Sequence, residues 1–320
     1  MLKNSAIFSI YELKVIFGES KLNNFTENFI SNAVSTDSRT LEPNNIFVAI
    51  KGDNFDGHSK VSEAFDKGAG CCVVDKKFYE ECDLKNKPMI VVDDTIEALG
   101  QLAKYHRLRF EIPIVAICGS NGKTSTKEMT AALLEKKYRV LKTYQNFNNQ
   151  IGVPLMLLQL NNEYEIAVLE LGTNYPGEIA ILSEIAMPNY ALITNIGKEH
   201  LEELLDLDGV ELEETSVFSK IRGRGVAFIN DDDERLKRYT MIMDSNVRFG
   251  TGEGIEISGK ISLNEMLNPS IEFTHSQGKF SVNMQTFGYA SALNALAAVS
   301  VAKFFEVDDN LLKEALEQFV

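Results

Sequence analysis

The fold is decided by the stretch Ile114-Val-Ala-Ile-Cys-Gly-Ser-Asn-Gly-Lys-Thr-Ser-Thr126, in which an apolar run passes directly into a glycine-containing loop. The apolar run predicts a buried strand, and the residues from Thr126 to Lys136 favour a helix. Glycines let backbone N–H groups turn inward, and a helix N-terminus adds partial positive charge, so this arrangement suits a phosphate group. Lys123 can reach the terminal phosphates of a nucleotide, and Thr124 is placed to bind the accompanying magnesium ion.

The loop matches the common phosphate-loop pattern only in part. That pattern has a further glycine five positions before Gly122, where this sequence has Ile117. A glycine-rich turn without a ligand is therefore the alternative. We favour the phosphate loop because Gly-Lys-Thr lies at the start of the predicted helix, directly after a strand. The predicted nucleotide contacts of this loop are Gly119, Ser120, Asn121, Gly122, Lys123, Thr124 and Ser125.

Strands and helices alternate after Pro113, which predicts an α/β domain with a mostly parallel sheet flanked by helices, similar to a P-loop ATPase. The expected strands are 114–118, 138–142, 165–171, 190–194 and 226–230. The expected helices lie near 123–136, 149–158, 177–186 and 290–305. Short strand-like runs between 245 and 286 predict an antiparallel annex on this sheet. We assign this domain to residues 113–320.

Residues 1–112 form a separate small mixed α/β domain in our interpretation. A chain of 320 residues is too long for one average core, so two domains are expected. The expected strands are 34–39, which runs into a turn, 46–50, 71–74 and 89–92, and the expected helices are 10–17, 61–68 and 95–109. No low-complexity linker separates the domains, so we expect a hinge near 110–113.

The bulk composition excludes several classes of partner. The formal net charge of −14 argues against nucleic acid or an anionic membrane surface. No apolar run reaches the roughly 18 residues that span a bilayer, and the N-terminus lacks the apolar core of a signal peptide. The 4 cysteines show no metal-ligand spacing and fit a reducing compartment. We therefore expect a cytoplasmic protein without membrane insertion, and a monomer.

Further motifs, in their order along the chain, resemble the Mur ligases of peptidoglycan synthesis. They are Ser35–Arg39, Phe47–His58, Gly119–Met129, Asn146–Pro154, Leu169–Gly172 with Pro176–Ile179, Ile193–Gly197 with His200–Glu202, and Asn294–Ala298. The resemblance implies an ATP- and Mg²⁺-dependent ligase of cell-wall precursor synthesis that forms an amide bond through an acyl phosphate. It is strongest for the enzymes whose substrates are a UDP-N-acetylmuramoyl-tripeptide and D-alanyl-D-alanine.

The resemblance also implies roles for individual residues. The implied catalytic residues are Lys123, Glu170 and His200, and the implied magnesium ligands are Thr124, Glu170 and His200. Asn149 and Asn294 join the nucleotide contacts. The implied contacts to the UDP-sugar end of the substrate are Ser35, Thr36, Ser38, Arg39, Lys51, Gly52 and His58. Taken singly, Glu170 could be a solvated carboxylate, His200 a structural histidine, and Arg39 a partner of Asp37 across a turn.

The sequence departs from the family pattern at three places. The family has a lysine, modified to a carbamate that binds magnesium, where this chain has Glu214. We hypothesise that Glu214, or Glu213 beside it, supplies that ligand without carbon dioxide, since magnesium prefers hard oxygen donors. The alternative is a solvated acidic helix over 202–214. Ala290 and Ser291 replace a histidine–asparagine pair near the adenine, which leaves Ser291 to offer one hydrogen bond.

The third departure is that the chain stops at Val320, where the family continues into a third domain. We expect either a truncated chain or a two-domain relative, and in both cases ligand binding with little or no turnover. Two alternative functions stay open. One is a Mur ligase that adds the third amino acid, a lysine or diaminopimelate, and the other is a non-catalytic nucleotide-binding relative. Folylpolyglutamate synthase shares the ATP domain but lacks the N-terminal domain.

Overall fold

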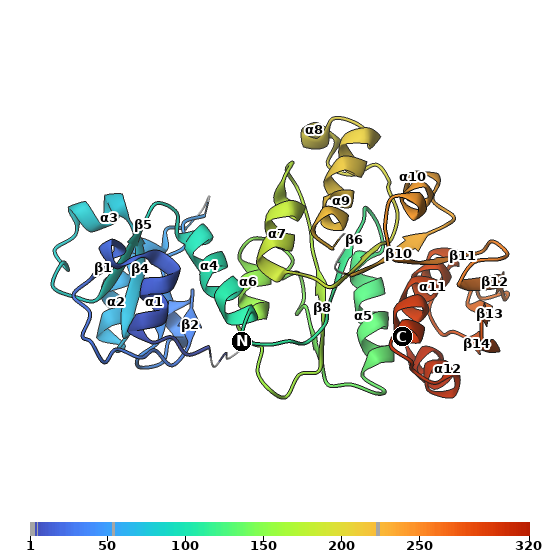
Figure 1. Cartoon of the computed structure of the whole chain (residues 1–320), viewed down its shortest axis with the longest axis horizontal. Helices are drawn as coiled ribbons and strands as arrows, with labels where there is room; N and C mark the ends of the chain where they lie inside the picture. The colour runs from blue at the N-terminus through green and yellow to red at the C-terminus, as the bar shows by residue number, and fades with distance from the viewer. Residues whose placement is uncertain (1–3, 5, 53–54, 222–224) are drawn as a thin grey trace. The chain divides into compact units, whose positions relative to one another are not determined.

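The computed structural model describes residues 4, 6–52, 55–221 and 225–320. The chain divides into two compact units (Figure 1), one formed by Met1–Glu111 with Gln150–Asn161 and the other by Ile112–Asn149 with Asn162–Val320. Each is described by itself below. Asp53 and Asn54 of the Phe47–His58 motif lie outside the described residues, as do the first three residues on which part of the signal-peptide argument depends.

The first unit contains a sheet whose strand order, in the described residues, is β1-β5-β4-β3-β2. The strands are β1 (Leu22–Asn23), β2 (Val34–Ser35), β3 (Ile46–Val48), β4 (Cys71–Asp75) and β5 (Met89–Val92). Strands β2 to β5 pair in parallel, and β1 joins β5 in the antiparallel sense. Every residue of β3 is buried, as expected for a parallel strand covered on both faces.

Helices and short 3₁₀ turns complete this unit. They are α1 (Ile10–Phe17), η1 (Glu19–Lys21), η2 (Ser38–Thr40), η3 (Gly57–Lys60), α2 (Val61–Asp66), α3 (Lys76–Glu81), α4 (Thr95–Arg107) and α6 (Gly152–Leu157). Ser9 and Glu12 form a reciprocal capping box that begins α1. Helix α6 packs against α4, so the helix predicted at 149–158 joins the unit that precedes it in sequence.

The second unit contains a larger sheet, ordered β14-β13-β12-β11-β10-β9-β6-β8-β7 over the described ranges. Its strands are β6 (Ile114–Cys118), β7 (Val140–Lys142), β8 (Ile166–Glu170), β9 (Tyr190–Ile193), β10 (Val226–Asn230), β11 (Asn246–Gly250), β12 (Ile257–Leu263), β13 (Pro269–His275) and β14 (Gly278–Asn283). Neighbours from β7 to β12 pair in parallel. The mostly parallel α/β sheet is therefore confirmed. The antiparallel annex begins only at β12, because β11 still pairs in parallel with β10.

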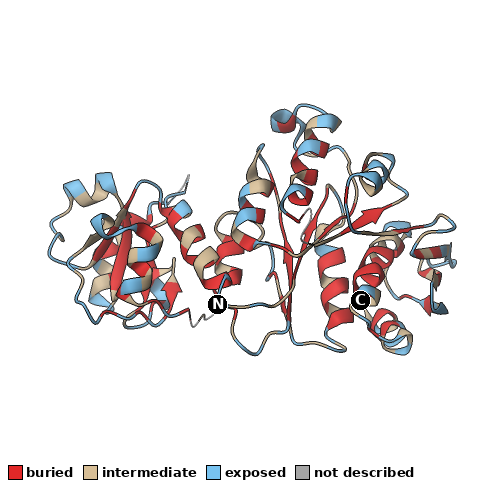
Figure 2. Cartoon of the chain, viewed as in Figure 1, coloured by how far each residue is buried: buried red, intermediate tan, exposed pale blue. Residues whose placement is uncertain are grey.

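Helices cover both faces of this sheet. They are α5 (Lys123–Leu134), α7 (Glu178–Ala186), α8 (Leu201–Leu204), α9 (Leu207–Ile221), α10 (Glu234–Lys237), η4 (Arg238–Met241), α11 (Tyr289–Phe304) and α12 (Asp309–Gln318). Val115 and Ile117 of β6 share a core cluster with Met129 of α5. Side chains alternate along a strand, so the equally buried Ile114 and Ala116 face the other side, where α9 contacts β6. Figure 2 shows the resulting buried centre in red. None of the helices in the described residues has the length and apolar character to cross a membrane.

The acidic stretch 202–214 forms α8 and the first half of α9. Glu211, Glu213 and Glu214 of α9 are buried, so the alternative of a solvated acidic helix is wrong for this half. Glu211 accepts a hydrogen bond from Arg235 at 2.8 Å and another from Arg238. Buried carboxylates require such partners, because burial of an unpaired charge is costly. The sequence pattern missed this because a run of acidic residues does not reveal which of them turn inward.

Glu213 fixes the start of α7. Its Oε1 accepts hydrogen bonds from the backbone N–H of Ile179 at 2.8 Å and from the hydroxyl of Thr173 at 3.1 Å. Its Oε2 accepts from the backbone N–H of Gly177 at 2.6 Å. The first N–H groups of a helix have no partner within the helix, and a carboxylate there also interacts favourably with the helix dipole. Glu213 therefore joins α9 to α7 as a capping residue.

We predict that Glu213→Ala lowers the free energy of unfolding by about 2 kcal/mol, because it leaves buried N–H groups at the start of α7 without acceptors. Chemical denaturation measures the change. Glu203→Ala, at an exposed glutamate on α8, is the matched control and should change stability by no more than about 0.5 kcal/mol. Equal stability of the two variants would contradict the capping role.

Candidate functional site

The loop Gly119–Gly122 lies at the carboxyl end of β6, between β9 and β8 in the sheet, and leads directly into α5. Sites in open parallel sheets lie at this edge. Gly119 has φ +117° and Gly122 has φ +80°, a region that favours glycine. A Cβ on Gly119 would lie 2.2 Å from Thr194 Oγ1, and one on Gly122 would lie 2.4 Å from Asn294 Oδ1. Gly119 is thus required by conformation and by space, since its Cβ would also meet the backbone of Thr194, while Gly122 is favoured mainly by its positive φ.

The segment that follows β9 holds this loop in place. The backbone N–H of Ser120 donates to the carbonyl of Asn195 at 2.9 Å, and the Ser120 hydroxyl exchanges hydrogen bonds with Gly197 at 2.8 and 3.1 Å. The carbonyl of Asn121 accepts from the Thr194 hydroxyl at 2.6 Å and from the Asn195 side chain at 3.0 Å. These bonds join the ends of β6 and β9 into one rigid edge.

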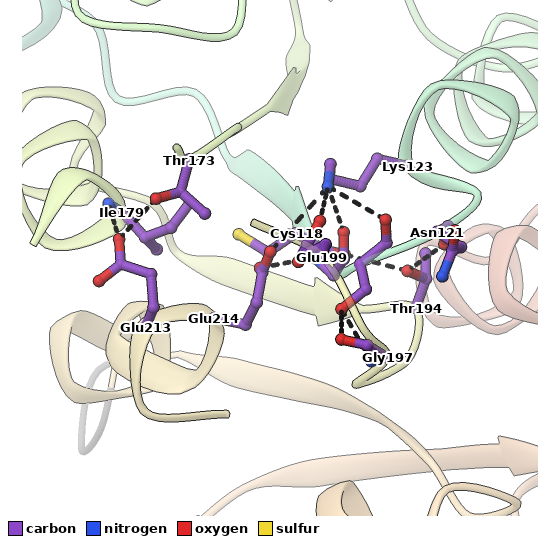
Figure 3. A network of polar contacts seen from close by, with 12 residues as sticks. Cys118, Asn121, Lys123, Thr173, Ile179, Thr194, Gly197, Glu199, Glu213 and Glu214 are labelled. Carbon is purple, nitrogen blue, oxygen red and sulfur yellow. Dashed lines mark hydrogen bonds and ion pairs between the residues drawn. The ribbon is translucent and has the colours of Figure 1, made fainter. Parts of the chain in front are cut away.

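Lys123 lies folded back over the loop, as Figure 3 shows. Its Nζ donates to the carbonyl of Gly119 at 2.5 Å and to Glu199 Oε2 at 3.2 Å. Glu214 Oε1 lies 4.0 Å from the same Nζ. The lysine side chain is 17% exposed, against 11% for Glu199 and 0% for Glu214. One ammonium group therefore faces two carboxyl groups in a site with little access to water.

Glu214 joins α9 to the phosphate-type loop. Its Oε2 accepts a hydrogen bond from the backbone N–H of Gly119 at 2.6 Å, and its Oε1 is buried without a hydrogen-bond partner in the described residues. Burial raises the pKa of Glu214 well above its usual value; Lys123 opposes that shift and Glu199 adds to it. Of the two glutamates that we considered for the carbamate position, Glu214 therefore lies at the loop, while Glu213 caps α7.

Glu170 ends β8, the strand beside β6. It is buried; its Oε1 accepts from the Asn148 side chain at 2.7 Å, and its backbone N–H donates to the Thr143 hydroxyl at 2.9 Å. Lys127, which is fully buried on α5, donates to the Thr143 carbonyl at 2.9 Å. The second oxygen, Oε2, is buried without a hydrogen-bond partner in the part of the chain that the structure describes. Asn148 thus orients one carboxylate oxygen of Glu170, and the other oxygen can bind a metal ion or a hydrogen-bond donor.

The predicted magnesium ligands are only partly gathered. His200 is exposed and precedes α8 with φ +44°, and Thr124 is exposed in the first turn of α5, as is Ser125. Over residues 4, 6–52, 55–221 and 225–320, no three His, Cys, Asp or Glu side chains lie close enough together to hold a metal ion. The structure therefore does not bring Glu170, His200 and Glu214 to one point. The unpartnered oxygens of Glu170 and Glu214 are nevertheless the hard donors that magnesium prefers.

A cavity of about 220 Å³ adjoins the loop. Its lining residues come from the loop, the ends of β9 to β11, and α11, and they are Asn121, Gly122, Thr194, Asn195, Asn230, Phe249, Ala290, Leu293, Asn294 and Ala297. Asn294, predicted as a nucleotide contact, lies beside the loop in this lining. Ser291 does not line the cavity, because its hydroxyl donates to the Thr286 hydroxyl at 2.5 Å. The cavity wall is mainly apolar with a few amide groups, as in many ligand sites.

The first unit holds the predicted UDP-sugar residues. Arg39 is exposed and donates to Asp37 through Nε at 2.9 Å and through Nη2 at 2.7 Å, so the turn pairing that we considered is present. Arg39 holds the pKa of Asp37 below its usual value, mainly through this hydrogen bond. The hydroxyl of Ser35 bonds the backbone of Asp37, and that of Ser38 donates to Glu63. Thr36 is half-buried between them.

His58 is buried, and both of its ring nitrogens have partners within this unit. Nδ1 lies 2.7 Å from Asp56 Oδ1, and Nε2 accepts from the backbone N–H of Asp75 at 3.0 Å. Lys51 and Gly52 are exposed just before the gap in the described residues. The predicted set thus separates into exposed groups, which are available to a ligand, and internal groups that shape the turn.

Several residues of this site were not predicted, and three of them contact its charged or loop groups directly. They are Glu199 beside Lys123, Asn195 behind the loop, and Asn148 on Glu170. Asn195 and Asn148 lie inside quoted motifs, and Glu199 directly precedes His200, so their position in sequence was the available signal. Their roles depend on contacts over 22 to 76 positions of sequence, which no local pattern reveals.

Two family profiles match the chain. The profile described as "Mur ligase middle domain" matches residues 117–302, and the profile described as "Mur ligase family, catalytic domain" matches residues 31–107. The chain belongs to the Mur ligase family. The two matches cover much of both units, including the loop, Glu170, His200 and Glu214 of this Mur ligase chain.

Several relatives of this Mur ligase chain are named UDP-N-acetylmuramoyl-tripeptide–D-alanyl-D-alanine ligase. The protein of Escherichia coli is 37% identical over 84% of this chain and 59% of its own length. That of Buchnera aphidicola subsp. Baizongia pistaciae is 34% identical over 89% of this chain and 62% of its own. The chain thus spans about three fifths of the length of the curated relatives that it matches.

Solved structures of MurF have the same fold as this Mur ligase chain. MurF from Acinetobacter baumannii is 31% identical with a TM-score of 0.86, covering 98% of this chain and 68% of that one. MurF from Thermotoga maritima in complex with ADP is 28% identical with a TM-score of 0.79, covering 90% of this chain and 66% of that one.

We predict that Gly119→Ala destabilises this Mur ligase chain much more than Gly254→Ala. Both glycines have positive φ, which costs an alanine about 1 kcal/mol, but only Gly119 lacks room for a Cβ, because Thr194 lies against it. Gly254 has nothing within 4 Å of such a Cβ. Denaturation curves of the two variants measure the difference, and equal losses would contradict the close approach of Gly119 to Thr194.

Proposed function

We propose that this chain supplies the ATP-binding and UDP-sugar-binding parts of a ligase that joins D-alanyl-D-alanine to a UDP-N-acetylmuramoyl-tripeptide, a step of peptidoglycan precursor synthesis. The observation that carries the proposal is the loop Gly119–Gly122 with Lys123, at the edge where Glu170 ends the neighbouring strand. The names of the relatives support the choice of substrates.

ATP is the nucleotide in this proposal. Its phosphates lie at the start of α5, where the helix N-terminus favours negative charge. The N–H groups of Gly119, Ser120 and Asn121 are bonded to Glu214 and Asn195 instead. Lys123 supplies the positive charge, and the hydroxyls of Thr124 and Ser125 can donate hydrogen bonds. The adenine occupies the 220 Å³ cavity beside Gly122 and Asn294. A relative solved with ADP supports the choice of nucleotide.

The magnesium ligands in this proposal are Thr124, Glu170, His200 and Glu214, with Asn149 near the phosphates. The unpartnered buried oxygens of Glu170 and Glu214 fit a divalent cation by their donor chemistry. When bound, magnesium neutralises charge on the transferred phosphoryl group. A glutamate at position 214 has its carboxyl group encoded in the sequence, whereas a carbamate on lysine requires carbon dioxide.

The reaction proceeds in two displacements. A carboxylate oxygen of the tripeptide attacks the γ-phosphorus of ATP, the bond to the β-phosphate oxygen breaks, and ADP leaves. The amine of D-alanyl-D-alanine then attacks the acyl carbon, inorganic phosphate leaves, and the amine loses a proton to give the amide. Lys123 and the N-terminus of α5 stabilise the negative charge that develops on the phosphoryl oxygens during the first step.

The first unit binds the UDP-sugar end in this proposal. Its exposed polar groups, Arg39, Lys51 and Gly52, are available for direct contact, and Ser35 and Thr36 lie in the same turn. Ser38 and His58 support that surface through their internal hydrogen bonds. We keep residues 1–112 and 113–320 as the functional domains, with residues 150–161 packed on the first.

The protein is cytoplasmic and monomeric in this proposal. ATP and UDP-linked precursors are available in the cytoplasm, and all 4 cysteines are free thiols, as expected in a reducing compartment. Size-exclusion chromatography with light scattering tests the oligomeric state, and a mass twice that of the chain would contradict a monomer.

The experiment that tests the function measures binding first and product second. We expect ADP and UDP-N-acetylmuramoyl-tripeptide each to bind in calorimetry, and Lys123→Ala to weaken ADP binding by about tenfold or more through the loss of a charged hydrogen bond. Lys198→Ala, at an exposed lysine, is the matched control and should bind ADP normally. Failure of the wild-type chain to bind either ligand would overturn the proposal.

Product analysis separates the candidate functions. In a version of the protein extended past Val320, with ATP, magnesium, the tripeptide substrate and D-alanyl-D-alanine, the ligase forms ADP, phosphate and the UDP-linked pentapeptide in equal amounts. Product only from lysine or diaminopimelate with the dipeptide precursor would identify the ligase of the preceding step. Nucleotide binding without any amide product would favour a non-catalytic relative.

We predict that Glu214→Ala removes most of the gain in ADP affinity that magnesium provides, because it deletes a buried ligand oxygen beside the loop. Calorimetry with and without magnesium measures this gain in bicarbonate-free buffer. The wild-type protein should keep its gain there, since its carboxylate needs no carbon dioxide. Glu203→Ala is the control, and an unchanged magnesium dependence in Glu214→Ala would contradict the assignment.

A further inference from the structure

Glu199 contacts Lys123 at the loop, and the proposed reaction does not use this contact. It lies in the segment between β9 and α8, and its side chain is 11% exposed. Its Oε2 lies 3.2 Å from Lys123 Nζ. Its Oε1 is buried and, among residues that the structure describes, has no hydrogen-bond partner. Glu199 is thus a largely buried carboxylate whose described polar neighbours are Lys123 and the carboxyl group of Glu214.

The segment that carries Glu199 is held in a specific conformation. The hydrogen bonds of Ser120 with Gly197 tie it to the loop just before Glu199. His200, directly after Glu199, has φ +44°, which residues other than glycine adopt infrequently. The contact between Glu199 and Lys123 is therefore a defined feature of the fold and not a chance meeting of two long surface side chains.

This contact competes with any phosphate that enters the loop. An ammonium group has three donor hydrogens, and Lys123 Nζ donates to Glu199 and to the carbonyls of Gly119 and Ser120. A phosphate must replace at least one of these acceptors. It must also approach the negative charge of Glu199, and that repulsion is strong where water is largely excluded.

Glu199 is better suited than Glu214 to be displaced. Glu199 Oε2 is the nearer of the two to Lys123, at 3.2 Å against 4.0 Å. Glu214 is anchored in α9 and bonds the Gly119 backbone at 2.6 Å. Glu199 lies on a connecting segment, and its carboxyl group interacts with Lys123 and with the carboxyl group of Glu214.

We propose that Glu199 is a gating residue for nucleotide binding, which holds Lys123 in the absence of nucleotide and must be displaced by the incoming phosphates. This inference rests on the proposed nucleotide site. Glu199 acts through Lys123 and is a positioning residue rather than a catalytic one. Its effect is specific to ligands that carry phosphate, because the adenine cavity does not include Glu199.

The test compares ADP with adenosine in calorimetric titrations without magnesium. Glu199→Gln removes the charge with little change of shape, so ADP should bind about tenfold more tightly than to the wild-type protein. Adenosine has no phosphate, and its affinity should not change. Glu203→Gln, which removes a nearby exposed charge, should match the wild-type protein with both ligands. Glu199→Ala, with its fold checked by thermal melting, should behave as Glu199→Gln does.

The outcomes separate this inference from the proposed function. If the wild-type protein binds ADP and Glu199→Gln binds it equally or less tightly, the gating role is wrong and the nucleotide site stands. If adenosine gains as much affinity as ADP, the substitution acts on the base cavity and the gating role is also wrong. If no variant binds ADP, both proposals fail.

Discussion

The site depends on the close approach of Gly119 to Thr194, where β6 turns into its loop. A Cβ at this position would lie 2.2 Å from the threonine hydroxyl oxygen, so the strand can turn there only as glycine. The turn aims the Gly119 N–H at Glu214, at 2.6 Å, and brings its carbonyl to Lys123. Because β6 lies in the middle of the parallel sheet, this contact places the loop beside the ends of both neighbouring strands.

In this structure Lys123, the positive group expected to bind phosphate, is already paired with carboxyl groups. Burial of Glu214 disfavours its charged form, and Glu199 takes the nearer place beside the ammonium group. An ammonium and two carboxyl groups shielded from water interact more strongly than the same groups on the surface. The arrangement therefore resists the entry of a further anion unless a carboxylate moves or a cation accompanies the ligand. Glu170 lies at the end of the adjoining strand. Its second carboxylate oxygen has no hydrogen-bond partner in the described residues, so it can accept a hydrogen bond or bind a metal ion.

The sequence predicted the α/β class, the central strands and the loop because these depend on local signals. An apolar run, a glycine pair and a following helix are all visible within the residues from Ile114 to Lys136. Element ends were less accurate: the helix expected at 149–158 is Gly152–Leu157 and packs with the first unit. The acidic stretch before position 214 gave no sign that Glu211 and Glu213 turn inward, since their partners, Arg235 and the start of α7, lie elsewhere in the chain.

By itself, the sequence determined the family, the phosphate-type loop and the presence of a glutamate where the family pattern has lysine, because these are properties of residue order. Only the tertiary structure decided which glutamate reaches the loop: Glu214 does, and its neighbour Glu213 caps a helix instead. On a helix, consecutive side chains point about 100° apart, so the direction of each depends on how α9 packs against α7 and β6. The same holds for Glu199, whose contact with Lys123 joins residues 76 positions apart and arises only when β9 pairs beside β6.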